Sequence, residues 1–140
     1  MEFRTKVELP AKGPKIQHTD RLMIWGSCFS EHIGNLLAEH KFNCDVNPFG
    51  VLYNPMSIAT SIQCLLKKAL YRTEDLREEQ GGWYSLMHHS TFSSHEAEDC
   101  LQKINQRIAQ GHENLKQADW IIFTWGSSFV YTWKENGEIV

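Results

Sequence analysis

The segment Leu22-Met23-Ile24-Trp25-Gly26-Ser27-Cys28-Phe29 decides the fold. Its first four residues are a continuous apolar run, which is typical of a strand buried on both faces of a parallel sheet. Gly26 and Ser27 interrupt this run, and apolar residues then return at helical spacing over 28–40 as Phe29, Ile33, Leu36 and Leu37. The segment therefore predicts a buried strand, a sharp turn and an amphipathic helix that begins at Cys28.

Two more apolar segments predict further strands of the same sheet. The first, 42–46, follows the helix and completes a strand–helix–strand unit. The second, 119–126, is the most apolar run in the chain and predicts its most deeply buried strand. Helices are expected after Asn54-Pro55, where Asn caps and Pro fits the first turn, and over 97–108, after a capping box from Ser93 to Glu96. This order predicts an α/β fold, a three-layer, flavodoxin-like doubly wound parallel sheet.

Shorter elements are expected between and beyond these. They are an edge strand near 3–9, a helical turn at 73–76, an extended segment at 83–87 and a strand at 129–134. Asn136-Gly137 is a preferred pair for a two-residue type I′ hairpin turn. Because only three residues follow that turn, we expect 1–140 to be the N-terminal portion of one domain whose C-terminal half is absent. An incomplete sheet exposes an apolar edge, so we expect the isolated chain to self-associate, as a homo-oligomer or an aggregate.

Composition excludes several classes of function. The net charge of the 140 residues is −3 and the basic residues are scattered, which disfavours nucleic-acid binding. No stretch approaches the roughly 20 apolar residues of a membrane span, so no membrane partner is expected. The four cysteines are widely spaced, which disfavours a metal site, and no export signal is evident. Free thiols in the cytoplasm are therefore expected.

Small polar residues and glycine follow each predicted strand, in the loops 26–28, 46–55 and 126–128. Ligands of doubly wound sheets collect at these carboxyl ends. Cys28 follows Ser27, a good N-cap, so its sulfur should lie in the first helical turn, where backbone amides and the helix dipole favour a thiolate. A nucleophile on a strand-to-helix turn is a recurrent device of hydrolases. The alternative is that Cys28 packs under the helix and Gly-Ser is only a turn.

Two motifs resemble the signatures of a known family. The run 26–31, Gly-Ser-Cys-Phe-Ser-Glu, resembles the motif that names the GSCFA family, with Ser30 in place of the usual alanine. The run 47–55, Asn-Pro-Phe-Gly-Val-Leu-Tyr-Asn-Pro, resembles its second signature. The segments 83–90 and 120–126 also fit, so the similarity extends from about residue 3 to the end of the chain.

The resemblance implies a fold and a set of catalytic residues, because the GSCFA family is similar to the SGNH/GDSL hydrolases. It places Cys28 at the nucleophile position, with Ser27 as the competing candidate. Gly50 then corresponds to the glycine whose amide joins the oxyanion hole, and Ser128 to the asparagine donor. The base, from an Asp-x-x-His motif, is expected beyond Val140.

Further residues are candidates for contacts with a substrate. Asn47 carries an amide that can donate to a bound oxygen, and His89 adjoins a predicted strand end, where it can either contact substrate or pack as a polar side chain. The function expected is hydrolysis of an ester or acyl group through a covalent acyl-enzyme, acting on a small-molecule or carbohydrate ester without metal or organic cofactor. The alternative is a non-catalytic domain that binds a carbohydrate or small molecule and keeps an SGNH-like fold.

Overall fold

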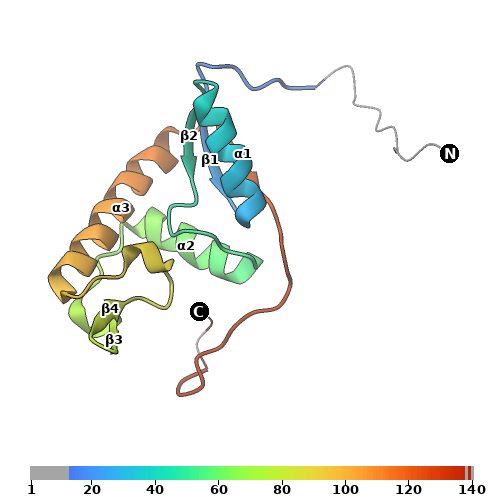
Figure 1. Cartoon of the computed structure of the whole chain (residues 1–140). Coiled ribbons are helices and arrows are strands. Elements are labelled where there is room, and N and C mark those ends of the chain that lie inside the picture. Colours follow the sequence, from blue (N-terminus) through green and yellow to red (C-terminus); the bar gives the residue numbers. More distant parts are fainter. Residues whose placement is uncertain (1–12, 138, 140) are drawn as a thin grey trace.

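The computed structural model describes residues 13–137 and 139, and its centre is a parallel sheet of three strands (Figure 1). The strands are β1 (Arg21–Trp25), β2 (Asn43–Val46) and β5 (Trp120–Phe123), in the order β2-β1-β5. β1 pairs in parallel with both of its neighbours. The predicted three parallel strands are therefore confirmed, whereas the edge strand expected near 3–9 lies outside the described residues.

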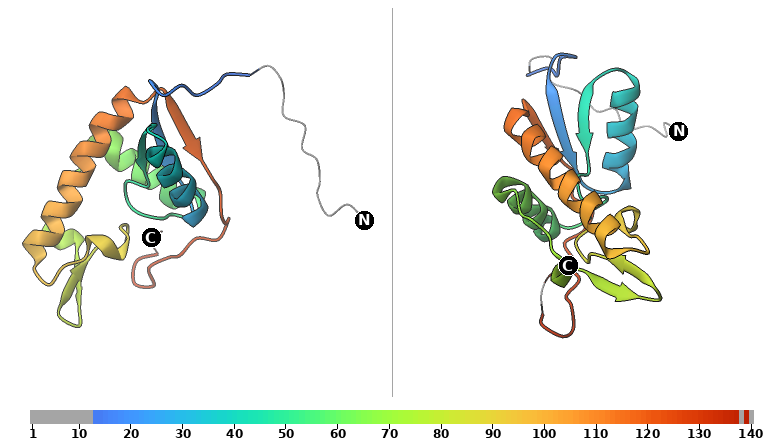
Figure 2. Two further views of the ribbon diagram at one scale, coloured as in Figure 1. Left: turned by 45° about the horizontal axis from the view of Figure 1, so that its top comes forward. Right: turned by 90° about the vertical axis from the view of Figure 1, so that its left-hand side faces the viewer.

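Helices cover both faces of the sheet. Helix α1 (Cys28–Glu39) lies on one face, and α2 (Pro55–Lys67) and α3 (Ala97–Gln117) lie on the other, as Figure 2 shows. This arrangement of helix, sheet and helices confirms the predicted α/β class.

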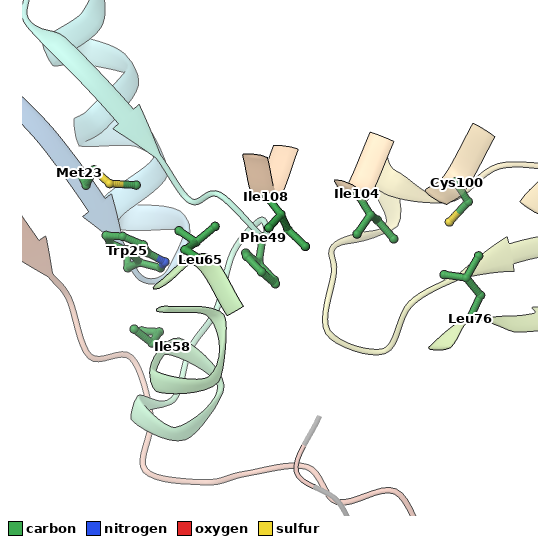
Figure 3. Packing of buried hydrophobic residues seen from close by; sticks show 9 residues of the cluster. All are labelled: Met23, Trp25, Phe49, Ile58, Leu65, Leu76, Cys100, Ile104 and Ile108. Atoms are coloured by element: carbon green, nitrogen blue, oxygen red, sulfur yellow. The ribbon is translucent and has the colours of Figure 1, made fainter. Parts of the chain in front are cut away.

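The main core lies between the sheet and the α2/α3 layer (Figure 3). Met23 and Trp25 of β1 point into it and are at most 1% exposed. They pack with residues of the other elements: Phe49, Ile58, Leu65, Ile104 and Ile108. Full burial of each such side chain contributes about 1.5–3 kcal/mol to folding. The alternating residues of the central strand, Leu22 and Ile24, are also buried, which explains its continuous apolar run.

Helix α1 is seated through small residues rather than through the predicted apolar stripe. Its buried residues are Ser30 and Gly34. A methyl group on Gly34 would lie 2.5 Å from Val46 Cγ2, so the helix approaches β2 too closely for any larger side chain. Phe29 and Leu36, two of the apolar residues at helical spacing, are 62% and 42% exposed.

The starts of the two longer helices follow different rules. In α2 the predicted cap is confirmed, because Asn54 Oδ1 accepts from the Ser57 N–H at 2.9 Å. In α3 the predicted capping box is wrong: Glu96 is the N-cap residue and makes no side-chain cap bond. The reason is that Ser94 exchanges two backbone hydrogen bonds with Trp83, at 2.7 and 3.0 Å, which keeps this segment extended.

An antiparallel hairpin, β3 (Arg77–Glu79) and β4 (Gly82–Tyr84), precedes α3. Its turn residues, Gln80 and Gly81, have φ of 52° and 76°, as a type I′ turn requires. The extended segment predicted over 83–87 is shorter than expected, because the strand β4 ends at Tyr84. The helical turn expected at 73–76 is confirmed as the 3₁₀ helix η1 (Thr73–Asp75), and a second one, η2 (Ser90–Phe92), follows β4.

The segment after β5 differs from its prediction. No strand forms over 129–134, although Thr132 makes an isolated bridge with Ile139. The type I′ turn expected at Asn136-Gly137 is wrong, because only Gly137 has a positive φ and its N–H donates to the Trp133 carbonyl at 2.8 Å. A longer, looser turn therefore closes this loop.

Strand β5 is not the most buried strand, contrary to prediction. Ile121 and Phe123 are 46% and 37% exposed. They pair with Met23 and Trp25 and therefore lie on the α2/α3 face of the sheet. They are exposed because β5 is at the edge of the described sheet, whereas α2 and α3 pack over the central strand β1.

Candidate functional site

The strand order creates a crevice beside the carboxyl end of β1. The chain passes from β1 to β2 on one side and later returns to β5 on the other side of β1. At such a reversal of strand order the loops leave in different directions, and ligands of doubly wound sheets bind there. The loops that follow β1 and β5 flank this point.

The loop after β2 is hydrogen-bonded to Gly26, the residue that follows β1. Asn47 Oδ1 accepts from the Gly26 N–H at 2.9 Å, and the Leu52 N–H donates to the Gly26 carbonyl at 3.1 Å. The same loop also holds the segment after β5, because the Tyr53 carbonyl accepts from the N–H groups of Gly126 and Ser127, at 3.0 and 2.9 Å. The predicted convergence of the three loops is confirmed.

Only glycine fits at position 26. Its φ is +148°, and a methyl group there would lie 2.2 Å from Thr124 Oγ1 and 2.5 Å from the Thr124 carbonyl oxygen. Ser30 Oγ links the two segments on either side of Gly26: it donates to the Trp25 carbonyl at 3.2 Å and lies 2.6 Å from Thr124 Oγ1. The turn that leads into Cys28 is thus fixed from two strands.

Cys28 is the first residue of α1 and is exposed. Ser27 is the N-cap: its Oγ accepts from the Phe29 N–H at 3.3 Å. Neither the Cys28 N–H nor its sulfur has a hydrogen-bond partner within the described part of the chain. The expected place of Cys28 in the first helical turn is confirmed, and its exposure contradicts the alternative that it packs under the helix.

The other three cysteines differ from Cys28. Cys100 is buried, and Cys44 and Cys64 are partly buried. Burial raises the pKa of each of these three thiols. They behave as small apolar residues.

The two residues predicted to complete an oxyanion hole are not both available. The Gly50 N–H donates to the Asn47 carbonyl at 2.8 Å, so this turn occupies it. Ser128 is exposed in the loop after β5, and its neighbour Ser127 lines the adjacent cavity.

Asn47 and His89, the candidates for substrate contact, occupy different environments. Asn47 is 7% exposed and has a φ of 44°; its Nδ2 is buried and has no partner among the residues that the structure describes. It supports the turn at Gly26 from inside. His89 is exposed and lines the cavity, and its Nδ1 accepts from the Thr91 N–H at 3.3 Å.

His88 is a partly buried, neutral histidine whose Nε2 is buried and has no partner among the described residues. Its ring stacks on Phe49 at 4.3 Å between centroids and meets the edges of Tyr71 and Phe92. Its Nδ1 lies 2.9 Å from Ser85 Oγ. Burial lowers the pKa of His88 to about 3, so the ring carries no charge near neutral pH.

A cavity of about 550 Å³ adjoins these loops. Its walls come from the loop before α2 with the first turn of α2, from the turn after β4 and from the segment after β5: Val51, Leu52, Tyr53, Asn54, Ser57, Leu86, Met87, His88, His89, Ser127, Phe129 and Tyr131. Sequence reasoning missed it, because no local pattern joins these three segments. The signal available was the second motif at 47–55, which supplies four of the wall residues.

The described residues form neither a metal-binding cluster nor a membrane-spanning helix. Within residues 13–137 and 139, no group of three or more His, Cys, Asp or Glu side chains is arranged to hold a metal ion. The described helices include none with the length and apolar content of a transmembrane span.

Comparison with known proteins identifies one family. Neither the curated proteins nor the solved structures yielded a match. The model of the GSCFA family matches residues 21–140, which include all three parallel strands and the loops that converge at Gly26. The chain belongs to the GSCFA family.

Proposed function

We propose that this protein is an acyl hydrolase or acyltransferase of the SGNH type and that Cys28 is its nucleophile. One observation carries the proposal: Cys28 is an exposed thiol at the first position of α1, where the loops after all three parallel strands converge. The N-terminus of a helix carries a partial positive charge of about half a unit, which stabilises a thiolate.

The reaction proceeds in two steps. The Cys28 thiol loses its proton, and the thiolate attacks the carbonyl carbon of an ester; an S–C bond forms, the C–O bond breaks, and the alkoxide takes up the proton that the thiol released and leaves as the alcohol. Water, or another acceptor hydroxyl, then attacks the thioester carbonyl, the S–C bond breaks, and the thiol is restored. Reducing conditions in a cytoplasm keep such a thiol active.

The oxyanion is stabilised first by the Cys28 N–H, which points from the helix N-terminus without a partner in the described residues. Gly50 donates as well only if its bond to the Asn47 carbonyl opens on substrate binding. Loss of one such donor costs about 3 kcal/mol of transition-state stabilisation. The substrate class proposed is a small-molecule or carbohydrate ester.

The test is hydrolysis of p-nitrophenyl acetate by three purified variants. Cys28→Ala should abolish turnover, Ser27→Ala should retain a weakened activity because only the helix cap is lost, and Cys44→Ala should match the wild type. If Ser27→Ala is inactive and Cys28→Ala is active, the nucleophile is Ser27. Equal activity in all three refutes a role for either residue.

A second function is favoured by the hydrogen bonds around the site. The Gly50 N–H, which is expected to join an oxyanion hole, donates instead to the Asn47 carbonyl at 2.8 Å. A non-catalytic domain that binds a carbohydrate or small molecule needs no free donors for an oxyanion. This alternative holds if p-nitrophenyl acetate is not hydrolysed and Cys28 reacts with iodoacetamide no faster than free glutathione does.

A further inference from the structure

The cavity beside the Cys28 loop differs from other hollows of the molecule in charge. None of the described residues that line it is Asp, Glu, Lys or Arg. Four other hollows each include charged side chains: Glu74, Asp75 and Arg77 in one, Glu79 in another, Arg21 and Asp45 in a third, and Lys103 in a fourth. The absence of charge is therefore a property of this cavity rather than of the surface in general.

Several polar side chains in its walls are hydrogen-bonded within the protein, whereas His88 Nε2 is buried and has no partner among the described residues. The Asn54 and Ser57 side chains are hydrogen-bonded to each other at 2.9 Å, and Ser127 Oγ accepts from Phe129. His88 is neutral, as described above. A charged ligand group would meet no Asp, Glu, Lys or Arg side chain here, so no ion pair with these residues would offset the hydration that it loses.

The rest of the cavity wall is apolar, and the cavity is large enough for a small molecule. Val51, Leu52, Leu86, Met87 and Phe129 provide it. A volume of about 550 Å³ falls within the range of small-molecule sites. Such walls gain free energy from each methylene group that they remove from water.

The cavity also adjoins the loop that carries the thiol. Ser127 and Tyr53 line it, and the Ser127 N–H is bonded to the Tyr53 carbonyl. A methyl group on the neighbouring Gly126 would lie 3.2 Å from the Tyr53 ring and 3.5 Å from Ser27 Cβ. Gly126 thus lies close both to Tyr53 of the cavity wall and to Ser27, the residue that precedes Cys28.

We propose that this cavity binds the uncharged, apolar acyl group of the ester substrate, while the alcohol part lies toward solvent. The inference rests on the proposed function of Cys28 and adds the substrate class: esters of medium-length neutral fatty acids, in preference to acetates and to half-esters of dicarboxylic acids.

The first test compares p-nitrophenyl acetate, butyrate, octanoate and hemisuccinate as substrates. Each added methylene should raise kcat/KM by about two- to fourfold. The hemisuccinate, which has the same number of acyl carbons as the butyrate but a carboxylate at its end, should be at least about tenfold poorer. Equal rates for acetate and octanoate, or a preference for the hemisuccinate, would overturn the proposal.

Variants locate the effect in the cavity. Val51→Trp should fill the cavity and abolish the preference for octanoate over acetate, and Val51→Lys should raise kcat/KM for the hemisuccinate relative to the butyrate. Leu66→Trp is the control, because Leu66 is 61% exposed on α2 and does not line the cavity. If Leu66→Trp alters the preference as much as Val51→Trp does, the cavity is not the acyl site.

Binding without turnover separates this inference from the proposed function. Octanamide is uncharged and resists hydrolysis, and calorimetry should show that the wild type binds it and Val51→Trp does not. If octanamide binds in this way but no ester is hydrolysed, the cavity assignment holds and the enzyme proposal fails. If esters are hydrolysed but octanamide does not bind, the cavity assignment fails alone.

Discussion

Replacement of Gly26 by alanine probes the turn on which the whole site depends. The added methyl would lie 2.2 Å from Thr124 Oγ1, 2.5 Å from the Thr124 carbonyl oxygen and 2.7 Å from Ser30 Oγ. The loop cannot move away easily, because Asn47 and Leu52 bond the N–H and C=O of Gly26. The methyl must therefore displace β5 or break these bonds.

The magnitude follows from two contributions. A φ of +148° is strained for any residue with a side chain, at a cost of about 1–3 kcal/mol. Overpacking against Thr124 adds about 1–3 kcal/mol. Gly26→Ala should therefore lower the free energy of unfolding by about 2–6 kcal/mol.

Urea unfolding followed by tryptophan fluorescence measures this change, with Gly126→Ala as the matched control. A methyl on Gly126 meets no atom closer than 3.2 Å, so that variant should stay within about 1 kcal/mol of the wild type. Gly26→Ala combined with Thr124→Ala should recover only part of the loss, because the carbonyl contact and the strained φ remain. A Gly26→Ala protein as stable as the wild type, or full recovery in the double variant, would refute the reasoning.

Three further predictions concern other parts of the molecule. Iodoacetamide should label Cys28 much faster than Cys100 in the folded protein, as peptide mass spectrometry would show, since one thiol is exposed and the other buried. Burial lowers the pKa of His88 from 6.5 to about 3, so between these pH values the unfolded chain binds a proton that the folded chain does not. The free energy of unfolding should therefore fall as the pH drops from 6.5 toward 3, by up to about 1.4 kcal/mol per pH unit. His88→Phe should flatten this part of the measured pH profile. Gly34→Ala should destabilise the protein by about 1–3 kcal/mol in urea unfolding, and an added Val46→Ala should recover much of the loss; additive effects of the two changes would contradict the close approach of α1 to β2.

The sequence predicts well what depends on neighbouring residues. The apolar run before Gly26, the cap at Ser27 and the Asn54-Pro55 start are local signals, and each predicted its element correctly. The parallel pairing followed because helices separate the strands.

The sequence predicts poorly those features that depend on contacts with a distant segment of the chain. The face that α1 buries is set by Val46 on β2, which admits only Gly34 and so excludes the larger residues. The capping box predicted at Ser93 does not form, because Ser94 pairs instead with Trp83, which lies 11 residues earlier in the chain. Local turn chemistry at Asn136-Gly137 is not realised, while Gln80-Gly81 forms the type I′ turn because two strands flank it.

The candidate site divides in the same way. The place of Cys28 in the first turn of α1 follows from its own cap and helix, so the sequence predicts it. The sequence left open whether Cys28 is exposed or packs under the helix, and the fold decides that it is exposed. The roles of Gly50 and Asn47 do not follow, because the Gly50 N–H bonds to a carbonyl in its own turn and Asn47 turns inward to Gly26. The cavity joins three distant segments and needs the folded chain to be seen at all.

The most direct test of the central claim is the capture of the acyl-enzyme. The protein should be mixed with p-nitrophenyl octanoate, quenched in acid, and examined by intact-mass and peptide mass spectrometry. The account predicts an octanoyl group on the peptide that contains Cys28, removed by neutral hydroxylamine as a thioester is, and absent from Cys28→Ala. An adduct on Ser27 that survives neutral hydroxylamine, or ester hydrolysis with no covalent adduct at either residue, would contradict it.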